Sequence, residues 1–218
     1  MELKDLKINF LGDSITNGTG ASATENRFID KVAEYTGAVC RNYGIGGTRI
    51  ARQHKPSEIP EFDLDYCSRV AEMDPDADVV VVFGGTNDYD HGDAPVGKFS
   101  DRTPDTFYGA LHTLYTSLIE KYSDSYIIVM TPLHRCGENF IHQGVDGPKA
   151  PLKDYVNIIR EVAEYYSLPV IDLYATSGLQ PEIPIIKEKF MADGLHPTDL
   201  GHKIIAKKVV AFLKNTVI

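Results

Sequence analysis

The sequence predicts an α/β fold in which a parallel sheet of about five strands lies between two layers of helices. Short apolar segments rich in β-branched residues alternate along the chain with longer segments of helical periodicity. The apolar segments are nearly continuous in hydrophobicity, which is typical of strands buried on both faces. Right-handed crossovers between such strands place helices on both sides of the sheet. A length of 218 residues fits a single domain, here residues 1–218.

The elements can be placed in order from these patterns. Strands are predicted at 6–11, 38–43, 77–83, 125–131 and 169–173. Helices are predicted at 26–36, 62–73, 104–121, 152–166 and 198–214. Thr103 and Pro104 suit the N-cap and first position of the third helix, and Thr198 opens the last one. The irregular segment 132–151 is long for a compact domain, which predicts a functional loop such as a lid.

Charge and cysteine content exclude several classes of partner. The chain has 22 basic and 31 acidic residues and a net charge of -9, which disfavours nucleic acid and anionic membranes as partners. Cys40, Cys67 and Cys136 form no C-x-x-C pair, so neither a disulfide framework nor a thiolate zinc site is indicated. The start of the chain shows no signal peptide, and no later stretch has the roughly 18 apolar residues of a membrane span. We therefore expect a cytoplasmic protein.

Polar and glycine residues follow each predicted strand. The carboxyl ends of parallel strands meet at one edge of the sheet, where ligands bind, so these residues are expected to converge. The five segments, in chain order, are Gly12 to Ser14, Asn42 to Arg49, Gly84 to Asp88, His134 with Arg135, and Asp193 to His196.

Three of these residues could form a nucleophilic triad. Taken alone, Ser14 could be a helix cap, a turn residue or a nucleophile. His196 could take its proton, and Asp193, three residues earlier, could reach the Nδ1 side of the imidazole. Asn87, the Ser14 backbone N–H and a glycine within 44–47 could donate hydrogen bonds to an oxyanion. This set of groups is what acyl transfer to a hydroxyl requires.

The same residues resemble the sequence blocks of the SGNH (GDSL-type) hydrolase family. In order along the chain, the blocks are Gly12-Asp13-Ser14-Ile15-Thr16, Asn42 to Gly47, Gly85-Thr86-Asn87-Asp88 and Asp193-x-x-His196-Pro197. The resemblance implies a flavodoxin-like three-layer sandwich and ester hydrolysis without a cofactor. It also implies that Ser14 is the nucleophile and a backbone donor, His196 the general base, Asp193 the triad acid and Asn87 an oxyanion donor. Of Gly44, Gly46 and Gly47, counting from Asn42 favours Gly47 as the third donor.

Further residues near this edge have less specific interpretations. Asp13, Arg49, His134 and Arg135 are candidate substrate contacts. The acidic run from Asp88 to Asp93 could suggest a metal site, but a solvated loop is the better interpretation, and Asp88 itself is expected to support the loop. We predict no metal.

Other candidates fit less well. Asp172 competes for the role of triad acid, although a structural pairing suits it better. The remaining histidines show no spacing that couples them to a nucleophile: His54, His91, His112, His142 and His202.

Two other motifs are not indicated, because key residues do not stand at the positions that each motif requires. The segment 18–23 fits G-x-G-x-x-A, but GDSIT already occupies the turn where a dinucleotide fingerprint would begin. Thr16 stands where the G-x-S-x-G nucleophile elbow of α/β-hydrolases would have its second glycine.

The sequence thus favours a serine esterase acting on a small-molecule ester, with a short acyl group such as acetyl and a small polar or carbohydrate-like alcohol. Two alternatives are an acyltransferase with the same acyl-enzyme and a non-catalytic carbohydrate-binding relative. The sequence predicts no particular oligomeric state.

Overall fold

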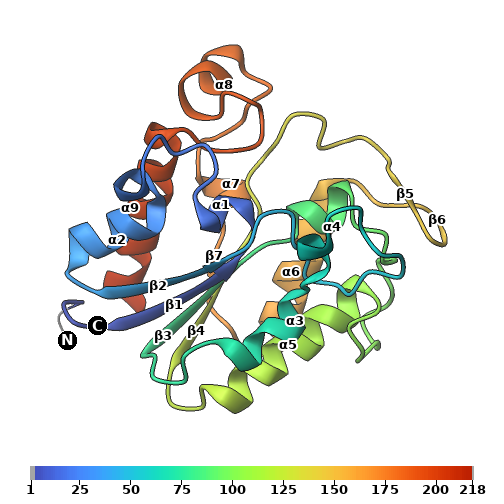
Figure 1. Ribbon diagram of the computed structural model, residues 1–218, viewed down its shortest axis with the longest axis horizontal. Helices are drawn as coiled ribbons and strands as arrows, with labels where there is room; N and C mark the ends of the chain where they lie inside the picture. The colour runs from blue at the N-terminus through green and yellow to red at the C-terminus, as the bar shows by residue number, and fades with distance from the viewer. Residues whose placement is uncertain (1–2, 218) are drawn as a thin grey trace.

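The central sheet has five parallel strands in a computed structural model that describes residues 3–217 (Figure 1). The strands are β1 (Lys7–Gly12), β2 (Val39–Gly44), β3 (Val79–Phe83), β4 (Tyr126–Met130) and β7 (Val170–Ile171). Their order across the sheet is β2-β1-β3-β4-β7, and every neighbouring pair is parallel. This is the flavodoxin-like doubly wound order, so the predicted fold class is confirmed. Met1, Glu2 and Ile218, which the predicted domain includes, lie outside the described residues.

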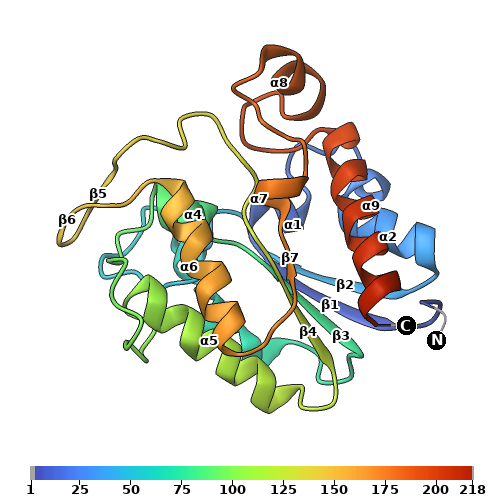
Figure 2. The ribbon, with the colours of Figure 1, turned by 180° about the vertical axis from the view of Figure 1, so that it is seen from behind.

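Helices cover both faces of the sheet. One face carries α2 (Phe28–Thr36) and α9 (Asp199–Thr216). The other carries α3 (Tyr66–Arg69), α5 (Phe107–Lys121) and α6 (Leu152–Tyr165). The two views in Figures 1 and 2 show these groups on opposite sides of the strands.

Each layer of helices packs on alternate residues of the strands. In β3, Val79 and Val81 contribute to the core under α2 and α9, whereas Val80 and Val82 contribute to the core under α5 and α6. All four are at most 2% exposed, and burial of such a side chain contributes about 1.5–3 kcal/mol.

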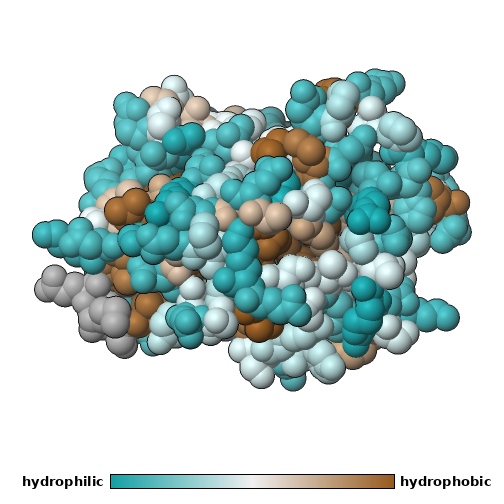
Figure 3. Space-filling model, turned by 60° about the horizontal axis from the view of Figure 1, so that its bottom comes forward, coloured by the Kyte–Doolittle hydropathy of each residue, from teal (hydrophilic) through white to brown (hydrophobic). Residues whose placement is uncertain are grey.

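Seen with the lower end of the molecule forward, the surface is mostly hydrophilic, with hydrophobic residues in small separate patches (Figure 3).

Two predicted helices differ from those observed. The segment 62–73 contains only the short helix α3, between the 3₁₀ turns η2 (Pro60–Asp63) and η3 (Val70–Glu72). The chain breaks there because the Asp65 carboxylate caps α3 by accepting the Ser68 N–H at 2.9 Å. Helix α5 begins at Phe107 and not at Pro104, because Thr106, not Thr103, accepts the Gly109 N–H.

Several short elements could not be predicted from the periodicity of apolar residues. Three helices of at most five residues begin near strand ends: α1 (Ser14–Asn17), α4 (Thr86–Asp90) and α7 (Leu173–Thr176). The 3₁₀ turn η1 (Thr24–Asn26) precedes α2, and α8 (Pro184–Phe190) precedes α9. The irregular segment 132–151 contains a hairpin of β5 (Gln143–Gly144) and β6 (Gly147–Pro148).

The strand order reverses between β1 and β3, which places the crevice of an open α/β sheet at the carboxyl end of β1. That crevice is where the sequence puts Ser14. Within residues 3–217, none of the helices combines the length and the apolar character needed to cross a bilayer.

Candidate active site

Ser14 is the first residue of α1, directly after β1. The Asp13 carboxylate accepts the Ile15 N–H at 3.0 Å and so caps this helix. Because Ser14 is the first residue of α1, its backbone N–H has no acceptor within the helix. The turn therefore presents both the hydroxyl and a backbone donor of Ser14 at the edge of the sheet.

A hydrogen-bonded chain links Ser14, His196 and Asp193. Ser14 Oγ lies 2.9 Å from His196 Nε2, and His196 Nδ1 lies 2.6 Å from Asp193 Oδ2. With Nδ1 donating to the carboxylate, Nε2 is left to accept the serine hydroxyl proton. The structure thus brings together three of the residues that the sequence selected, across 182 positions from Ser14 to His196.

The backbone of one turn holds Asp193 in place. Its Oδ1 accepts the N–H groups of Leu195 and His196, at 2.8 and 2.7 Å. Partial burial alone would raise the pKa of Asp193, but hydrogen bonds from the His196 ring and from these N–H groups lower it below its usual value. The carboxylate is therefore ionised at neutral pH and can stabilise an imidazolium.

A cleft of about 310 Å³ opens beside this chain. Its lining residues are Ser14, Thr19, Gly46, Gly47, Phe62, Asn87, Asp90, His91, Leu195 and His196. Gly44 does not line it, since a Cβ there would lie 2.2 Å from the Asn17 nitrogen in α1. Gly47 has φ +75°, a conformation that suits glycine.

Asn87 enters the cleft from α4. Its Nδ2 donates one hydrogen bond to Thr48 O at 3.0 Å, so the second N–H of the amide has no role in that contact. The neighbouring Asp88 accepts the N–H groups of Ile50 and Ala51 at 3.0 and 2.8 Å. Asp88 therefore supports the loop, as the sequence suggested, although burial raises its pKa to about 6.

Two proposed substrate contacts are structural instead. Asp13 is 2% exposed and is occupied as the cap of α1. Arg49 is 5% exposed, and its Nη1 donates to Ser57 Oγ and Phe62 O. Neither side chain lines the cleft. The partners of Asp13 and Arg49 are instead within the fold: the Ile15 N–H of α1 for Asp13, and groups of the 57–63 segment for Arg49.

His134 and Arg135 lie behind the cleft wall. His134 Nδ1 contacts the Glu138 carboxylate at 2.8 Å, and its ring packs on Tyr174 with centroids 3.8 Å apart. Arg135 forms an ion pair with Asp90, a residue of the cleft, at 3.0 Å. Arg135 thus acts on the site through Asp90, and neither residue is in the lining.

The segment 132–151 is anchored to the rest of the site. Lys149 is 5% exposed, and its Nζ donates to the carbonyls of Asp88, Asp90 and Gly92 at 2.9, 3.1 and 2.7 Å. Burial lowers the pKa of Lys149 to about 8. The lysine fixes the carboxyl end of this segment to the end of α4.

The other sequence candidates have protein partners. Asp93 accepts the N–H groups of His54 and Lys55, and Asp90 pairs with Arg135, so the acidic run is engaged within the fold. In the described part of the chain, no three acidic, histidine or cysteine side chains gather as a metal site would require. Asp172 caps α7 and pairs with Arg160, away from the cleft.

The lining residues that were not among the predicted site residues include Thr19, Phe62, His91 and Leu195. Leu195 lies within the Asp193 to His196 block, so its place beside the base follows from that block. Phe62 falls in the segment predicted as a regular helix, and His91 had no spacing to a nucleophile. Only the folded path of the 57–63 segment brings Phe62 to the site.

Comparison with known proteins agrees with this geometry. Residues 10–204 match the model of the GDSL-like lipase/acylhydrolase family. The chain belongs to this family. Membership supports an esterase or acylhydrolase activity in general terms and confirms the resemblance found in the sequence.

Solved structures give the same result. A protein from Lactobacillus plantarum is 28% identical, with a TM-score of 0.83 over 99% of each chain. The lipase/acylhydrolase from Enterococcus faecalis is 25% identical, with a TM-score of 0.65 over 96% of each chain. An acetyl xylan esterase is 25% identical, with a TM-score of 0.63, over 94% of this chain and 98% of its own. A comparison with curated proteins finds no match.

The buried Asp13 carboxylate that caps α1 lowers the stability of the fold in a pH-dependent way, and a substitution can test this. Burial, opposed mainly by the Ile15 N–H bond, raises the pKa of Asp13 from 3.8 to about 6. At Asp13 the folded state therefore binds a proton more tightly than the unfolded state does. The folding stability that this bound proton contributes is lost as pH rises from about 4 to 6. Asp13→Asn keeps an acceptor for the Ile15 N–H without the charge. In urea unfolding, its stability relative to wild type should rise by about 2–3 kcal/mol between pH 4 and 7. A constant difference across that range would contradict this role of burial.

We expect Lys149 to be needed for both the folding stability and the ester-hydrolysing activity of the protein. Lys149→Met leaves three carbonyls without their ammonium donor, and each buried unsatisfied group costs about 1–3 kcal/mol. We expect urea unfolding to show a loss of at least about 2 kcal/mol, together with lower kcat/KM because α4 carries Asn87. The exposed Lys203→Met serves as the control and should change neither quantity. Equal behaviour of the two variants would show that the anchor is dispensable.

Proposed function

We propose that the protein is a serine esterase that removes a short acyl group, such as acetyl, from a small polar or carbohydrate-like substrate. The observation that carries this proposal is the chain from Ser14 Oγ to His196 Nε2 to the Asp193 carboxylate, with steps of 2.9 and 2.6 Å. It opens on a cleft of about 310 Å³, which suits a small ester.

The reaction proceeds through an acyl-enzyme. His196 Nε2 takes the Ser14 hydroxyl proton while Oγ attacks the ester carbonyl carbon. The tetrahedral intermediate collapses as Nε2 returns that proton to the departing alcohol oxygen. Water then gives a proton to Nε2 and attacks the acyl carbon, and Ser14 leaves as the hydroxyl with the proton that His196 held. Asp193 keeps the imidazole in the required tautomer throughout.

Three donors stabilise the negative oxygen of each intermediate. They are the Ser14 N–H at the start of α1, the Gly47 N–H and the free N–H of the Asn87 amide. Residues Ser14, Gly47 and Asn87 all line the same cleft, which supports this assignment. The Thr48 carbonyl orients the amide of Asn87 by accepting its other N–H.

The short acyl group is supported by the size of the cleft and by the similarity to an acetyl xylan esterase. Cytoplasmic location, and a small ester as the partner in place of nucleic acid or membrane, stay predictions of the sequence.

The nucleophile can be tested directly. Ser14→Ala removes the only hydroxyl that contacts His196 among the described residues, so turnover of p-nitrophenyl acetate and labelling by an organophosphonate probe should both disappear. The exposed Ser123→Ala is a matched control and should retain both. A thermal melt close to that of wild type should accompany the loss. Persistent labelling of the Ser14 variant would mean that another residue is the nucleophile.

The oxyanion role of Asn87 predicts a loss confined to the chemical step. Loss of one such donor typically costs about 10²–10³-fold in rate, so Asn87→Ala should lower kcat on p-nitrophenyl acetate by that factor. KM should change far less, because the donor acts on the tetrahedral intermediate. The exposed Asn215→Ala should leave kcat unchanged. A decrease in kcat of less than about fivefold would rule the role out.

A further inference from the structure

One wall of the cleft is made of two rings. Phe62, in η2, and His91, directly after α4, both line the cleft, and their ring centroids are 5.5 Å apart at an interplanar angle of 36°. Burial lowers the pKa of His91 to about 4, so its ring is uncharged near neutral pH. The wall therefore presents neutral ring surface to whatever the cleft binds.

This wall directly adjoins the expected oxyanion site. A Cβ placed on Gly47 would lie 2.2 Å from atoms of the Phe62 ring, so the ring packs against the bare backbone of that glycine. His91 follows the helix that carries Asn87. The two rings thus stand beside two of the three proposed donors.

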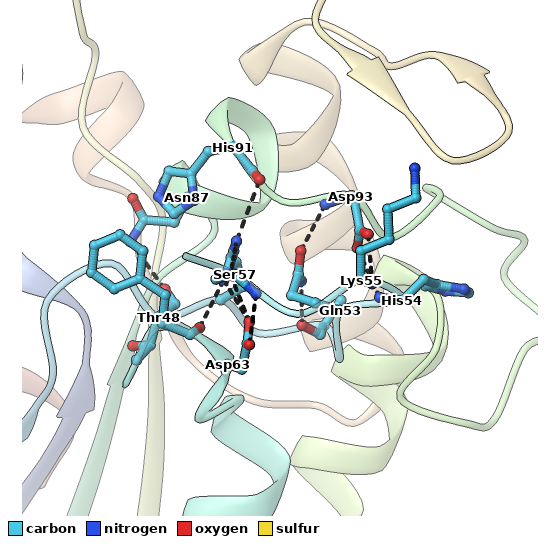
Figure 4. Close-up of polar contacts among 12 residues, drawn as sticks. Thr48, Gln53, His54, Lys55, Ser57, Asp63, Asn87, His91 and Asp93 are labelled. Carbon is cyan, nitrogen blue, oxygen red and sulfur yellow. Dashed lines mark hydrogen bonds and ion pairs between the residues drawn. The ribbon is translucent and has the colours of Figure 1, made fainter. Parts of the chain in front are cut away.

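Buried polar contacts fix the backbone that carries the two rings. Arg49 Nη1 donates to Phe62 O at 2.8 Å, and Arg49 Nη2 reaches His91 O at 3.4 Å, so one guanidinium contacts the backbone of both residues. Ser57 N and Oγ donate to the Asp63 carboxylate at 2.8 and 2.6 Å, which closes the 57–63 segment (Figure 4). The backbone beneath both rings is therefore fixed by hydrogen bonds that a larger substrate would have to break in order to displace it.

The chemistry decides which part of the ester meets the wall. The departing oxygen must receive its proton from His196 Nε2, so the alcohol lies on the side of His196 and Leu195. The carbonyl oxygen points to the donors, and Ser14 occupies the attacking face. The remaining substituent of the carbonyl carbon, the acyl chain, is left to face the rest of the lining, in which Phe62 and His91 are the two rings.

We propose that Phe62 and His91 form the end wall of the acyl site and restrict the enzyme to short acyl groups. This inference rests on the proposed esterase function and adds the residues that set acyl length. Arg49 is a positioning residue for the wall, which explains a buried guanidinium in a segment that otherwise supplies backbone donors.

The test is the dependence of kcat/KM on acyl length, measured with p-nitrophenyl acetate, butyrate and hexanoate. Wild type should prefer acetate over hexanoate strongly, because one methylene group changes kcat/KM by about 10–200-fold in a tight pocket. Phe62→Ala and His91→Ala should each raise the hexanoate-to-acetate ratio by at least about tenfold, and Phe62→Leu should raise it less. Phe140→Ala, at a phenylalanine that is 70% exposed and outside the cleft lining, should leave the ratio unchanged.

The outcomes separate this inference from the proposed function. A wild-type enzyme that cleaves hexanoate as well as acetate, or a ratio that stays the same in the Phe62 and His91 variants, would overturn the wall while leaving the esterase intact. An equal rise in Phe140→Ala would overturn it too. Absence of both turnover and Ser14 labelling in wild type would overturn the esterase itself. Phe62→Leu and His91→Ala keep the test decisive if Phe62→Ala does not fold, since each opens the wall by a smaller change.

Discussion

The buried carboxylate of Asp88 joins the segments that carry Gly47 and Asn87, two of the three proposed oxyanion donors. It accepts two consecutive backbone N–H groups, those of Ile50 and Ala51, and thereby ties the loop after β2 to helix α4. The Asn87 amide adds a third bond between the same segments through Thr48 O. The two oxygens of the carboxylate each accept one of these N–H groups, whereas an amide would offer only one oxygen. The relative position of Gly47 and Asn87 follows from this connection.

Other buried charges beneath the cleft serve the same end. The Arg69 guanidinium donates to the carbonyls of Tyr43 and Gly12 and to Thr48 Oγ1, which joins the ends of β1 and β2 to the loop. Burying a charge is costly unless hydrogen bonds replace the lost water, and each of these groups has several. Their partners lie in the loop after β2 and at the carboxyl ends of β1 and β2, where the strand ladders stop. Hydrogen bonds to charged side chains thus hold the loop after β2 in place, as hydrogen bonds between strands hold the sheet together.

The strands and the candidate site residues could be predicted from the sequence because both obey local rules. Each buried strand reads as a run of apolar residues, and a parallel sheet places whatever follows the strands at one edge, so Ser14, Asn87 and His196 were found together. Arg49 could not be placed, because its partners lie in a loop whose path has no periodicity. Phe62 was hidden for a related reason. The apolar spacing of 62–73 fits a helix, yet the Asp63 and Asp65 carboxylates bind backbone N–H groups and stop a helix from running through, and that interruption turns the ring toward the cleft.

The positions of the triad along the chain have a consequence for biosynthesis. Ser14 and the first strand leave the ribosome early, whereas Asp193 and His196 lie on one turn just before the last helix. At about 5–20 residues per second, the 182 positions that separate the hydroxyl from its base correspond to roughly 10–40 s of translation. During that interval Ser14 has no histidine beside it, and the cleft lacks Leu195 and His196 from its lining. The proposed active site is therefore completed in a single late event, together with the packing of α9 against α2.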